Sequence, residues 1–297
     1  MYIKNLKMRN VRKLEELILD NGVFNTEALM LLFKENSFPD RVPRVFKYLD
    51  MQEMPDVMEK KDFTVTTLNS LDEYLSIQNL LIPDTKVYVD GKLAGFALPF
   101  IPNHHNVGKM LHDCSTPFCQ KLFYVSQIGD IISKVQNVSS DTFRFQFGDL
   151  NEYNFILSQE GKINAIDLDS AYVGWNEPQE MIYYLLRNKI VRSVPEKYPV
   201  SKQLNIIPTD DTDLFCYHMI LLRVLAKEDF SCLPIEIYND YLDYIKKLPV
   251  PHELIESFES LYTIKKNWNP KDSIMGISEN LEEKLDYKTF QKNYYHK

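Results

Sequence analysis

Asp149, Asn154 and Asp167 are polar residues whose types and spacing could support the transfer of a phosphoryl group. Asn154 and Asp167 follow Asp149 by 5 and 18 residues. A carboxylate at a helix-to-loop junction, as expected for Asp149, can accept the proton of an incoming hydroxyl and hold that hydroxyl in line. Asn154 and Asp167 offer hard oxygen atoms, which Mg²⁺ accepts while it keeps water and phosphate oxygens as its other ligands. The alternative is that all three residues only cap turns, the commonest role of Asp and Asn in loops.

The elements around these residues are expected to bring them together. Residues 117–138 carry apolar side chains at three- and four-residue steps, which predicts one long buried helix ahead of Asp149. Two short strands are expected next, around 154–157 and 162–168, joined by a Gln-Glu-Gly turn. This hairpin would fold the chain back so that the two candidate metal ligands meet.

The first third of the chain has the pattern of short strands and helices. Residues 86–101 are the clearest unit, because two β-rich runs flank Asp90-Gly91, a dipeptide that readily adopts the positive φ angles of a hairpin turn. A short helix is expected just before this hairpin, over residues 69–83. A strongly apolar helix is expected much later, over residues 214–226.

The order of these elements predicts the fold class. With 297 residues, of which 44% are hydrophobic, the chain can bury one large core or two lobes that share an interface. A strand-rich first third followed by helices predicts an α+β fold of two unequal lobes. We expect an N-terminal lobe of residues 1–101 and a mainly helical lobe of residues 102–297.

Residues 147–154 read FGDLNEYN, and residues 166–170 read IDLDS. Together they resemble the catalytic loop and the metal-binding segment of the protein kinase-like superfamily, which includes aminoglycoside and choline kinases. In that superfamily a loop H-x-D-x-x-x-x-N is followed by D-F-G or I-D-x-x. The resemblance implies a two-lobed protein kinase-like fold with ATP and Mg²⁺ as cofactors. It also implies that Asp149 is the catalytic base, that Asn154 holds one Mg²⁺, and that Asp167 links the metal to the phosphates.

The resemblance further implies a strand lysine that contacts the nucleotide phosphates and a helix glutamate that pairs with it. Lys47 lies in the β-prone run VPRVFKYLD and resembles this lysine, while Glu73 in the helix over 69–83 is its natural partner. The pair requires an insertion at residues 51–63. Lys34 is a rival for the phosphate-binding lysine, and a solvated lysine on an edge strand is the alternative interpretation of Lys47.

Two further segments resemble parts of the superfamily. Leu98, Phe100 and Ile101 close the predicted hairpin where the interlobe hinge is expected, so their backbone groups would meet the edge of the adenine. Asp213, at the start of the apolar helix, resembles a buried aspartate that anchors the catalytic loop of protein kinases. The alternative for Asp213 is that it caps the helix.

The sequence also departs from the superfamily in three places. Phe147 replaces the histidine of the catalytic loop, so it would preserve packing while losing that residue's hydrogen bonds. Asp169 occupies a position that usually holds a residue with no role as a ligand. No glycine-rich loop is present, because Gly22 is the only glycine before Lys47. Residues 14–24 could still form a strand, turn and strand over the nucleotide.

Composition argues against several classes of protein. The formal net charge of −8 argues against a general nucleic-acid-binding surface. The basic stretch 187–202 could face an acidic or phosphorylated partner, although a solvated run of charges is the simpler interpretation. The four cysteines show no paired Cys-x-x-Cys spacing, and the adjacent His104 and His105 lack further ligands at suitable spacing, so we expect reduced thiols and no zinc site. We find no signal segment and no apolar run of about 18 residues, so we expect a cytoplasmic protein without membrane contact.

Two hypotheses for the function follow. The first is an ATP- and Mg²⁺-dependent kinase that transfers the γ-phosphate to a hydroxyl, with a protein Ser/Thr side chain slightly favoured over a small-molecule alcohol. The second is a pseudokinase that binds nucleotide or a partner protein as a scaffold. Phe147 and the absent glycine-rich loop favour the second hypothesis, whereas the joint retention of Asp149, Asn154 and Asp167 favours the first. The sequence leaves the oligomeric state open.

Overall fold

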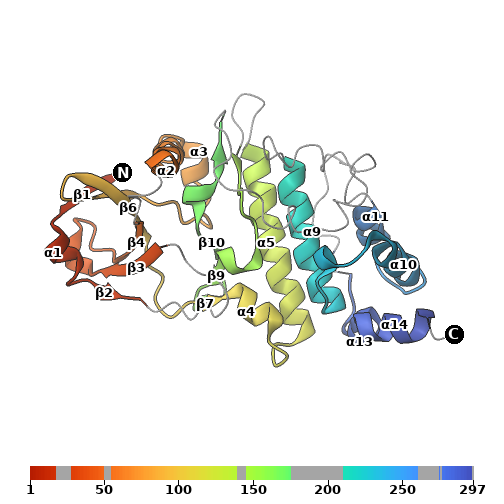
Figure 1. Ribbon diagram of the computed structural model, residues 1–297. Coiled ribbons are helices and arrows are strands. Elements are labelled where there is room, and N and C mark those ends of the chain that lie inside the picture. The colour runs from red at the N-terminus through yellow and green to blue at the C-terminus, as the bar shows by residue number, and fades with distance from the viewer. Residues whose placement is uncertain are drawn as a thin grey trace.

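A computed structural model of the chain describes residues 1–17, 28–49, 55–138, 145–174, 210–259, 274 and 276–295. The N-terminal part is built on a β-sheet and the C-terminal part is mainly helical (Figure 1), so the predicted α+β class is confirmed. Of the strand, turn and strand expected over residues 14–24, only residues 14–17 are described. The basic stretch 187–202 lies entirely outside the described residues.

The N-terminal part contains a six-stranded sheet with the order β1-β5-β6-β4-β3-β2. Its strands are β1 (Tyr2–Leu6), β2 (Glu15–Glu16), β3 (Ala28–Phe33), β4 (Arg44–Leu49), β5 (Thr85–Val89) and β6 (Lys92–Pro99). Neighbouring strands are antiparallel except β1 and β5, which run parallel. The predicted hairpin is the β5–β6 pair, and its turn residues Asp90 and Gly91 have φ angles of 49° and 84°.

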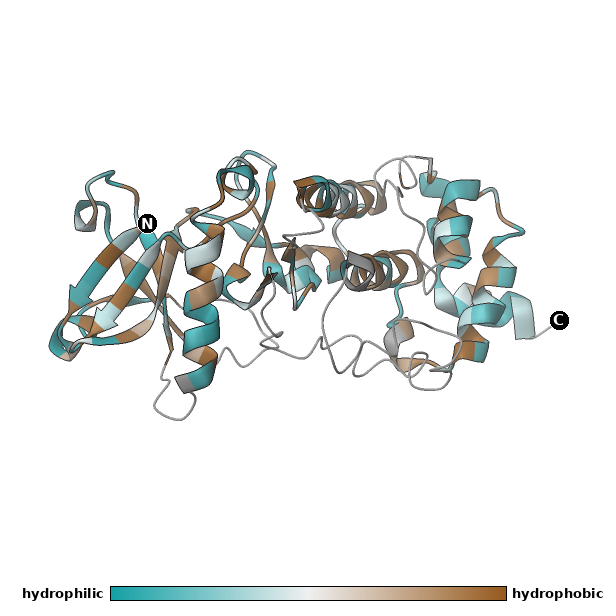
Figure 2. Cartoon of the chain, turned by 90° about the horizontal axis from the view of Figure 1, so that it is seen from above, coloured by the Kyte–Doolittle hydropathy of each residue, from teal (hydrophilic) through white to brown (hydrophobic). Residues whose placement is uncertain are grey.

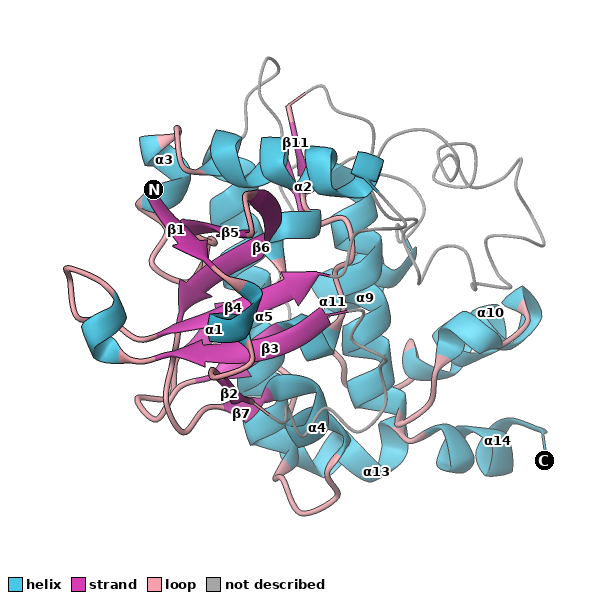
Figure 3. Cartoon of the chain, turned by 60° about the vertical axis from the view of Figure 1, so that its left-hand side comes forward, coloured by secondary structure: helices cyan, strands magenta, loops and turns pink. Residues whose placement is uncertain are grey.

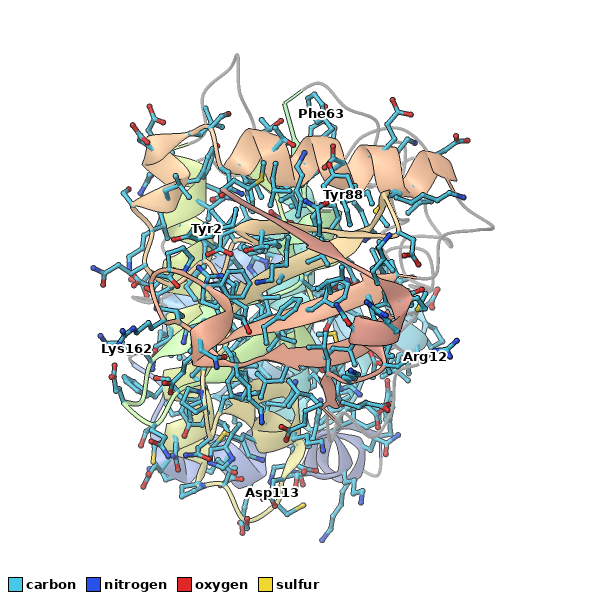
Figure 4. All side chains as sticks on the ribbon, turned by 90° about the vertical axis from the view of Figure 1, so that its left-hand side faces the viewer. Tyr2, Arg12, Phe63, Tyr88, Asp113 and Lys162 are labelled. Atoms are coloured by element: carbon cyan, nitrogen blue, oxygen red, sulfur yellow. The ribbon has the colours of Figure 1, made fainter. Side chains whose placement is uncertain are left out.

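The helix α2 (Pro55–Leu68) packs against this sheet (Figure 3). Its Met58 and Val65 form a small buried cluster with Leu49 of β4 and Phe96 of β6. The opposite side of α2 faces solvent, where Phe63 points away from the sheet (Figure 4). Most of α2 is hydrophilic (Figure 2). Besides this apolar cluster, an ion pair of 2.6 Å between Asp62 of α2 and Lys86 of β5 holds the helix on the sheet.

The helix predicted over residues 69–83 is wrong in extent and in role. Only the four residues of α3 (Asp72–Leu75) are helical there. The apolar pattern arises because Tyr74, Ile77 and Leu80 are buried in the core of the helical part. Residues 55–63 of the segment expected as an insertion instead form the first turns of α2, and residues 51–54 lie outside the described residues.

The C-terminal part is organised around α5 (Phe118–Val138) and α9 (Asp210–Ala226), which pack against each other (Figure 1). The helices predicted over 117–138 and 214–226 are thereby confirmed. Two small sheets, β10-β9-β7 and β11-β8, accompany them. The remaining elements are β7 (His105–Asn106), α4 (Val107–His112), β8 (Phe145–Gln146), η3 (Glu152–Asn154), β9 (Phe155–Leu157), β10 (Ile163–Ala165), η4 (Leu168–Ser170), β11 (Tyr172–Val173), η5 (Phe230–Cys232), α10 (Ile235–Ile245), α11 (His252–Glu259), η6 (Glu279–Leu281), α13 (Glu282–Leu285) and α14 (Tyr287–Tyr295). Over the described parts of the chain, no helix combines the length and apolar composition needed to cross a bilayer.

Gly95 in β6 lies against the strand that carries Lys47. Its φ is 143°, and a Cβ atom there would lie 2.0 Å from the Lys47 carbonyl oxygen. We therefore expect Gly95→Ala to lower the free energy of unfolding by about 2 kcal/mol, because both the backbone conformation and the space oppose a side chain. Gly161→Ala is the matched control, since Gly161 also has a positive φ of 76° but open space around it. Urea unfolding should show a loss of about 1 kcal/mol for the control, and equal losses for both variants would contradict the close contact at Lys47.

Candidate active site

The loop that carries Asp149 runs from β8 to η3 and passes close to η4. Gly148 has a φ of 74°, and a Cβ atom there would lie 2.7 Å from the carbonyl oxygen of Ser170. The pairing of β8 with β11 holds the two chain segments together on the other side of this contact. A side chain at position 148 would push them apart, so the glycine allows the Asp149 loop to lie beside the segment that follows Asp167.

Asp149 is half-buried and is held by two asparagines of its own loop. The Asn151 amide nitrogen donates to the Asp149 carboxylate at 3.0 Å. The Asn154 amide nitrogen donates to the Asp149 carbonyl oxygen at 2.8 Å. Because the nitrogen of Asn154 is used in this way, its Oδ1 atom is the one oriented for a cation.

The β9–β10 hairpin brings Asn154 next to Asp167, as the spacing predicts. The two strands pair from Ile163–Leu157 to Ala165–Phe155. The Ile166 N–H then donates to the Asn154 carbonyl oxygen at 2.9 Å. Asp167 follows with a left-handed backbone, φ 63° and ψ 32°. Asp tolerates this conformation better than most residues, and such strain is concentrated at functional sites.

Lys47 is the lysine that reaches this site. It lies on β4, and its Nζ atom contacts the Asp167 carboxylate directly and lies 3.2 Å from both carboxylate oxygens of Asp169. The rival Lys34 is exposed and lies just after β3. Of the two candidate lysines, Lys47 is therefore the one at the site. Its contact with Asp167 connects the N-terminal sheet to the predicted metal-binding segment.

The predicted ion pair between Lys47 and Glu73 is wrong. Glu73 is exposed on the short helix α3. Among the described residues, Lys47 forms ion pairs with Asp167 and Asp169. The error follows from the misplaced helix, because the helix that packs on the sheet is α2.

Lys61, on α2, is a site residue that the sequence reasoning missed. Its Nζ atom lies 3.1 Å from the Asp169 carboxylate and 2.5 Å from the Ser170 hydroxyl oxygen. Both Lys61 and Asp169 are buried. The available signal was Pro55-Asp56, because proline at the first helical position followed by an acidic residue is typical of a helix start. That start would have placed Lys61 in a helix near the lysine strand.

Four charged side chains determine the electrostatics of the site: those of Lys47, Lys61, Asp167 and Asp169. Burial alone would lower the pKa of Lys47, but Asp167 and Asp169 raise it well above its ordinary value, so Lys47 is a fixed cation. Burial raises the pKa of Asp167 despite the opposing effect of Lys47. Burial also acts to raise the pKa of Asp169, but Lys47 and Lys61 outweigh it and lower that pKa. Asp169 is therefore a permanent buried anion between two ammonium groups.

The loop that carries Asp149 is anchored by α9. The Phe147 N–H donates to the buried Asp213 carboxylate at 3.1 Å. Because α9 begins at Asp210, Asp213 lies inside the helix, which supports the anchoring interpretation over the capping one. The Phe147 ring packs edge-to-face on Phe145, with ring centroids 5.2 Å apart. Phe147 thus occupies the position that the superfamily resemblance gives to a histidine, and its ring is held there by packing on Phe145.

Removing the Asp213 acceptor is expected to destabilise this loop. In Asp213→Ala the buried Phe147 N–H loses its partner, so we expect the free energy of unfolding to fall by about 2 kcal/mol. Asp213→Asn keeps an acceptor oxygen and should lose clearly less. Thermal and urea unfolding of both variants measure this difference, and a loss that is as large in Asp213→Asn as in Asp213→Ala would mean that the acceptor is not the cause.

The predicted hinge residues have most of their backbone groups engaged within the protein. Leu98 pairs with Val45 across β4 and β6. The Phe100 N–H donates to the Pro43 carbonyl oxygen at 2.9 Å, and His104 Nδ1 lies 2.6 Å from the Ile101 carbonyl oxygen. The Phe100 N–H is therefore already used within the protein and does not serve as a donor for the predicted contact with adenine.

A cavity of about 570 Å³ lies on one side of this segment. Phe100 and Ile101 line it together with residues of α5 and of the β9–β10 turn. Its lining includes neither Lys47 nor Asp167, so the cavity is separate from the Lys47–Asp167 contact.

The donor set fits a Mg²⁺ ion that is held partly by a nucleotide. Within the described residues, no group of three or more His, Cys, Asp or Glu side chains is arranged to hold a metal. Asn154 and Asp167 offer two oxygen donors that lie close together along the hairpin. Mg²⁺ is commonly bound by one or two protein ligands together with phosphates and waters.

These elements define a protein kinase-like fold. They are the six-stranded sheet with α2 packed on it, the contact between Lys47 and Asp167, and the helical part around α5 and α9. The sequence resemblance to that superfamily is thus confirmed at the level of fold.

Comparison with solved structures gives 1636 matching chains. One is the apo structure of the GRMZM2G135359 pseudokinase, with a TM-score of 0.55 and 11% sequence identity, covering 95% of this chain and 97% of that chain. No family model and no curated protein matches the sequence. At this identity the likeness concerns the fold alone.

Proposed function

We propose that the protein is an ATP- and Mg²⁺-dependent phosphotransferase that transfers the γ-phosphate to a hydroxyl, with a protein Ser/Thr side chain favoured over a small alcohol. The observation that carries this proposal is the contact of Lys47 with Asp167, beside Asn154 and the Asp149 loop. A strand lysine, two neutral or anionic oxygen donors and a half-buried carboxylate are the groups that phosphoryl transfer needs.

Each residue has a definite role in this proposal. Asn154 Oδ1 and the Asp167 carboxylate would hold Mg²⁺, which neutralises charge on the phosphates when it is bound. The Lys47 ammonium would turn from Asp167 to the phosphate oxygens. The Asp149 carboxylate, fixed by the Asn151 amide, would accept a hydrogen bond from the acceptor hydroxyl and orient it in line.

A pseudokinase that binds nucleotide or a partner protein as a scaffold is the second candidate. It is favoured by the basic residue Lys61 on α2, where the superfamily resemblance implies a glutamate, and by Phe147 in the loop. The structural neighbour named above is itself described as a pseudokinase. Retention of Asp149, Asn154 and Asp167 weighs against this candidate, because a scaffold has no chemical need for all three.

The two candidates are separated by turnover and binding measured on the same protein. The purified chain is incubated with γ-labelled ATP and Mg²⁺, with and without EDTA, alone and with a mixture of Ser/Thr peptides. The kinase proposal predicts label transfer, or ATP hydrolysis, that requires the metal and is lost in Asp167→Ala. Nucleotide-induced thermal stabilisation without turnover supports the pseudokinase. Turnover that is unchanged in Asp167→Ala would contradict the proposed site.

A further inference from the structure

We propose that Asp169 is the positioning residue of Lys47, in the role that the superfamily resemblance gave to a helix glutamate, and that Lys61 holds Asp169 in place. This inference deepens the proposed function and rests on it for the role of Lys47 at the phosphates. It gives a function to the second aspartate of IDLDS, which the motif comparison left without one.

The contacts of Asp169 support this role. Lys47 Nζ lies 3.2 Å from both carboxylate oxygens, so Asp169 receives the ammonium in a bidentate manner. From the other side, Lys61 Nζ lies 3.1 Å from Oδ2. The Asp169 side chain is 3% exposed, whereas that of Asp167 is 30% exposed. Asp167 is thus open to a metal ion, and Asp169 is enclosed between the two lysines.

The arrangement is a reversal of charge between helix and loop. In the expected arrangement the helix supplies an anion to the strand lysine. Here α2 supplies the cation Lys61, and the anion comes from η4, two residues after Asp167. A buried carboxylate is costly unless cations or hydrogen-bond donors contact its oxygens, and the ammonium groups of Lys47 and Lys61 provide those contacts.

The orientation of Lys47 is therefore tied to the loop that binds the metal. When Lys47 moves from Asp167 to the phosphates, its ammonium group would keep its contact with Asp169 and so remain next to the metal-binding segment. Two further hydrogen bonds fix α2 to the same loop. Lys61 reaches the Ser170 hydroxyl at 2.5 Å, and the Thr64 hydroxyl donates to the Ala171 carbonyl oxygen at 3.1 Å. The helix thus supports Asp169, which in turn contacts Lys47.

The first test measures nucleotide affinity. Asp169→Asn keeps the shape of the side chain but removes its charge, and we expect the Kd for Mg·ATP to rise about tenfold, the equivalent of one charge-assisted hydrogen bond. Glu73→Gln is the matched control and should bind as the unaltered protein does. In the double variant Lys61→Glu/Asp169→Asn the helix supplies the carboxylate, and most of the lost affinity should return. A purely structural role of Asp169 would not be rescued in this way.

The second test does not depend on nucleotide. Urea midpoints are compared for the unaltered chain, Lys47→Met, Asp169→Asn and the double variant Lys47→Met/Asp169→Asn. If Asp169 holds Lys47, Asp169→Asn should shift the midpoint much less in the Lys47→Met protein than in the unaltered chain. Additive shifts, or an unchanged Kd in a folded Asp169→Asn protein, would overturn the inference. A chain that binds no nucleotide but shows the coupling would refute the proposed function while leaving the Lys47–Asp169 pairing intact.

Discussion

Replacing Asp149 by asparagine is expected to lower kcat of phosphoryl transfer about a thousandfold, within the range that a positioned acid or base contributes. The substitution preserves the shape of the side chain. Asn151 donates to the side chain of residue 149 and Asn154 to its backbone carbonyl oxygen, and both partners remain in the variant. The fold and the affinity for Mg·ATP should therefore change little, because Asp149 is not among the proposed metal ligands. Steady-state kinetics with labelled ATP, together with a binding isotherm for a non-hydrolysable analogue, measure the two effects separately.

Asp243→Asn provides the control for this experiment. Asp243 is an exposed carboxylate on α10 that pairs with Lys246 at 3.4 Å, far along the chain from the Asp149 loop. Its replacement should leave kcat unchanged. If Asp149→Asn retains the kcat of the unaltered protein, the assignment of Asp149 as the base is wrong, whatever the protein binds.

The largest expected effect on stability is that of Arg44→Met in β4. The Arg44 side chain is buried, with Nη2 2.7 Å from both Asp40 and Asp84. Its guanidinium group also lies over the rings of Phe38 and Tyr2, 4.3 and 4.8 Å from their centroids. Removing it leaves two carboxylates without their common cation, so we expect the free energy of unfolding to fall by about 3 kcal/mol.

Lys7→Met is the matched control, because Lys7 pairs with Asp90 at 4.0 Å on the exposed surface and such pairs contribute little. The pH dependence gives a second readout. Hydrogen bonds from Arg44 hold the pKa of Asp40 well below its ordinary value of 3.8. This part of the stability is present above that value and is lost as the pH falls below it. Urea unfolding should therefore show a shallower loss in acid for Arg44→Met, and equal acid slopes would contradict the pairing.

Much of the fold could be predicted because its signals are local. The β5–β6 hairpin follows from Asp90-Gly91, and α5 follows from its apolar stripe. The approach of Asn154 to Asp167 follows from the length of the intervening hairpin. These features depend on residues that are near one another along the chain, where period and turn type determine the structure.

The identity of the helix beside the sheet could not be predicted as readily. Just before its last residue, Leu68, the α2 sequence carries Thr64, Val65, Thr66 and Thr67, which are poor helix formers. Its position is set by packing on Leu49 and Phe96. The apolar pattern at 71–81 is more regular, although Tyr74, Ile77 and Leu80 are buried in the core of the other lobe and Leu75 is exposed.

The partners of Lys47 depend on contacts over long separations. Lys61 and Ser170 are 109 residues apart, and Lys47 and Asp169 are 122 residues apart. No local pattern relates such residues, so the motif comparison identified Asp167 and left Asp169 without a role. The superfamily resemblance implies a helix glutamate, and the more regular helical pattern around Glu73 favours that residue over any in α2.

The central claim is that Asn154 and Asp167 hold a divalent cation between the Lys47 strand and the Asp149 loop. A crystal structure with Mn²⁺ and a non-hydrolysable ATP analogue tests this claim most directly, because manganese gives an anomalous signal at a site that accepts Mg²⁺. The account predicts an anomalous peak about 2.1 Å from Asn154 Oδ1 and from a carboxylate oxygen of Asp167, with Lys47 at the phosphates. Nucleotide bound elsewhere, or bound there with no metal at Asn154 and Asp167, would contradict it.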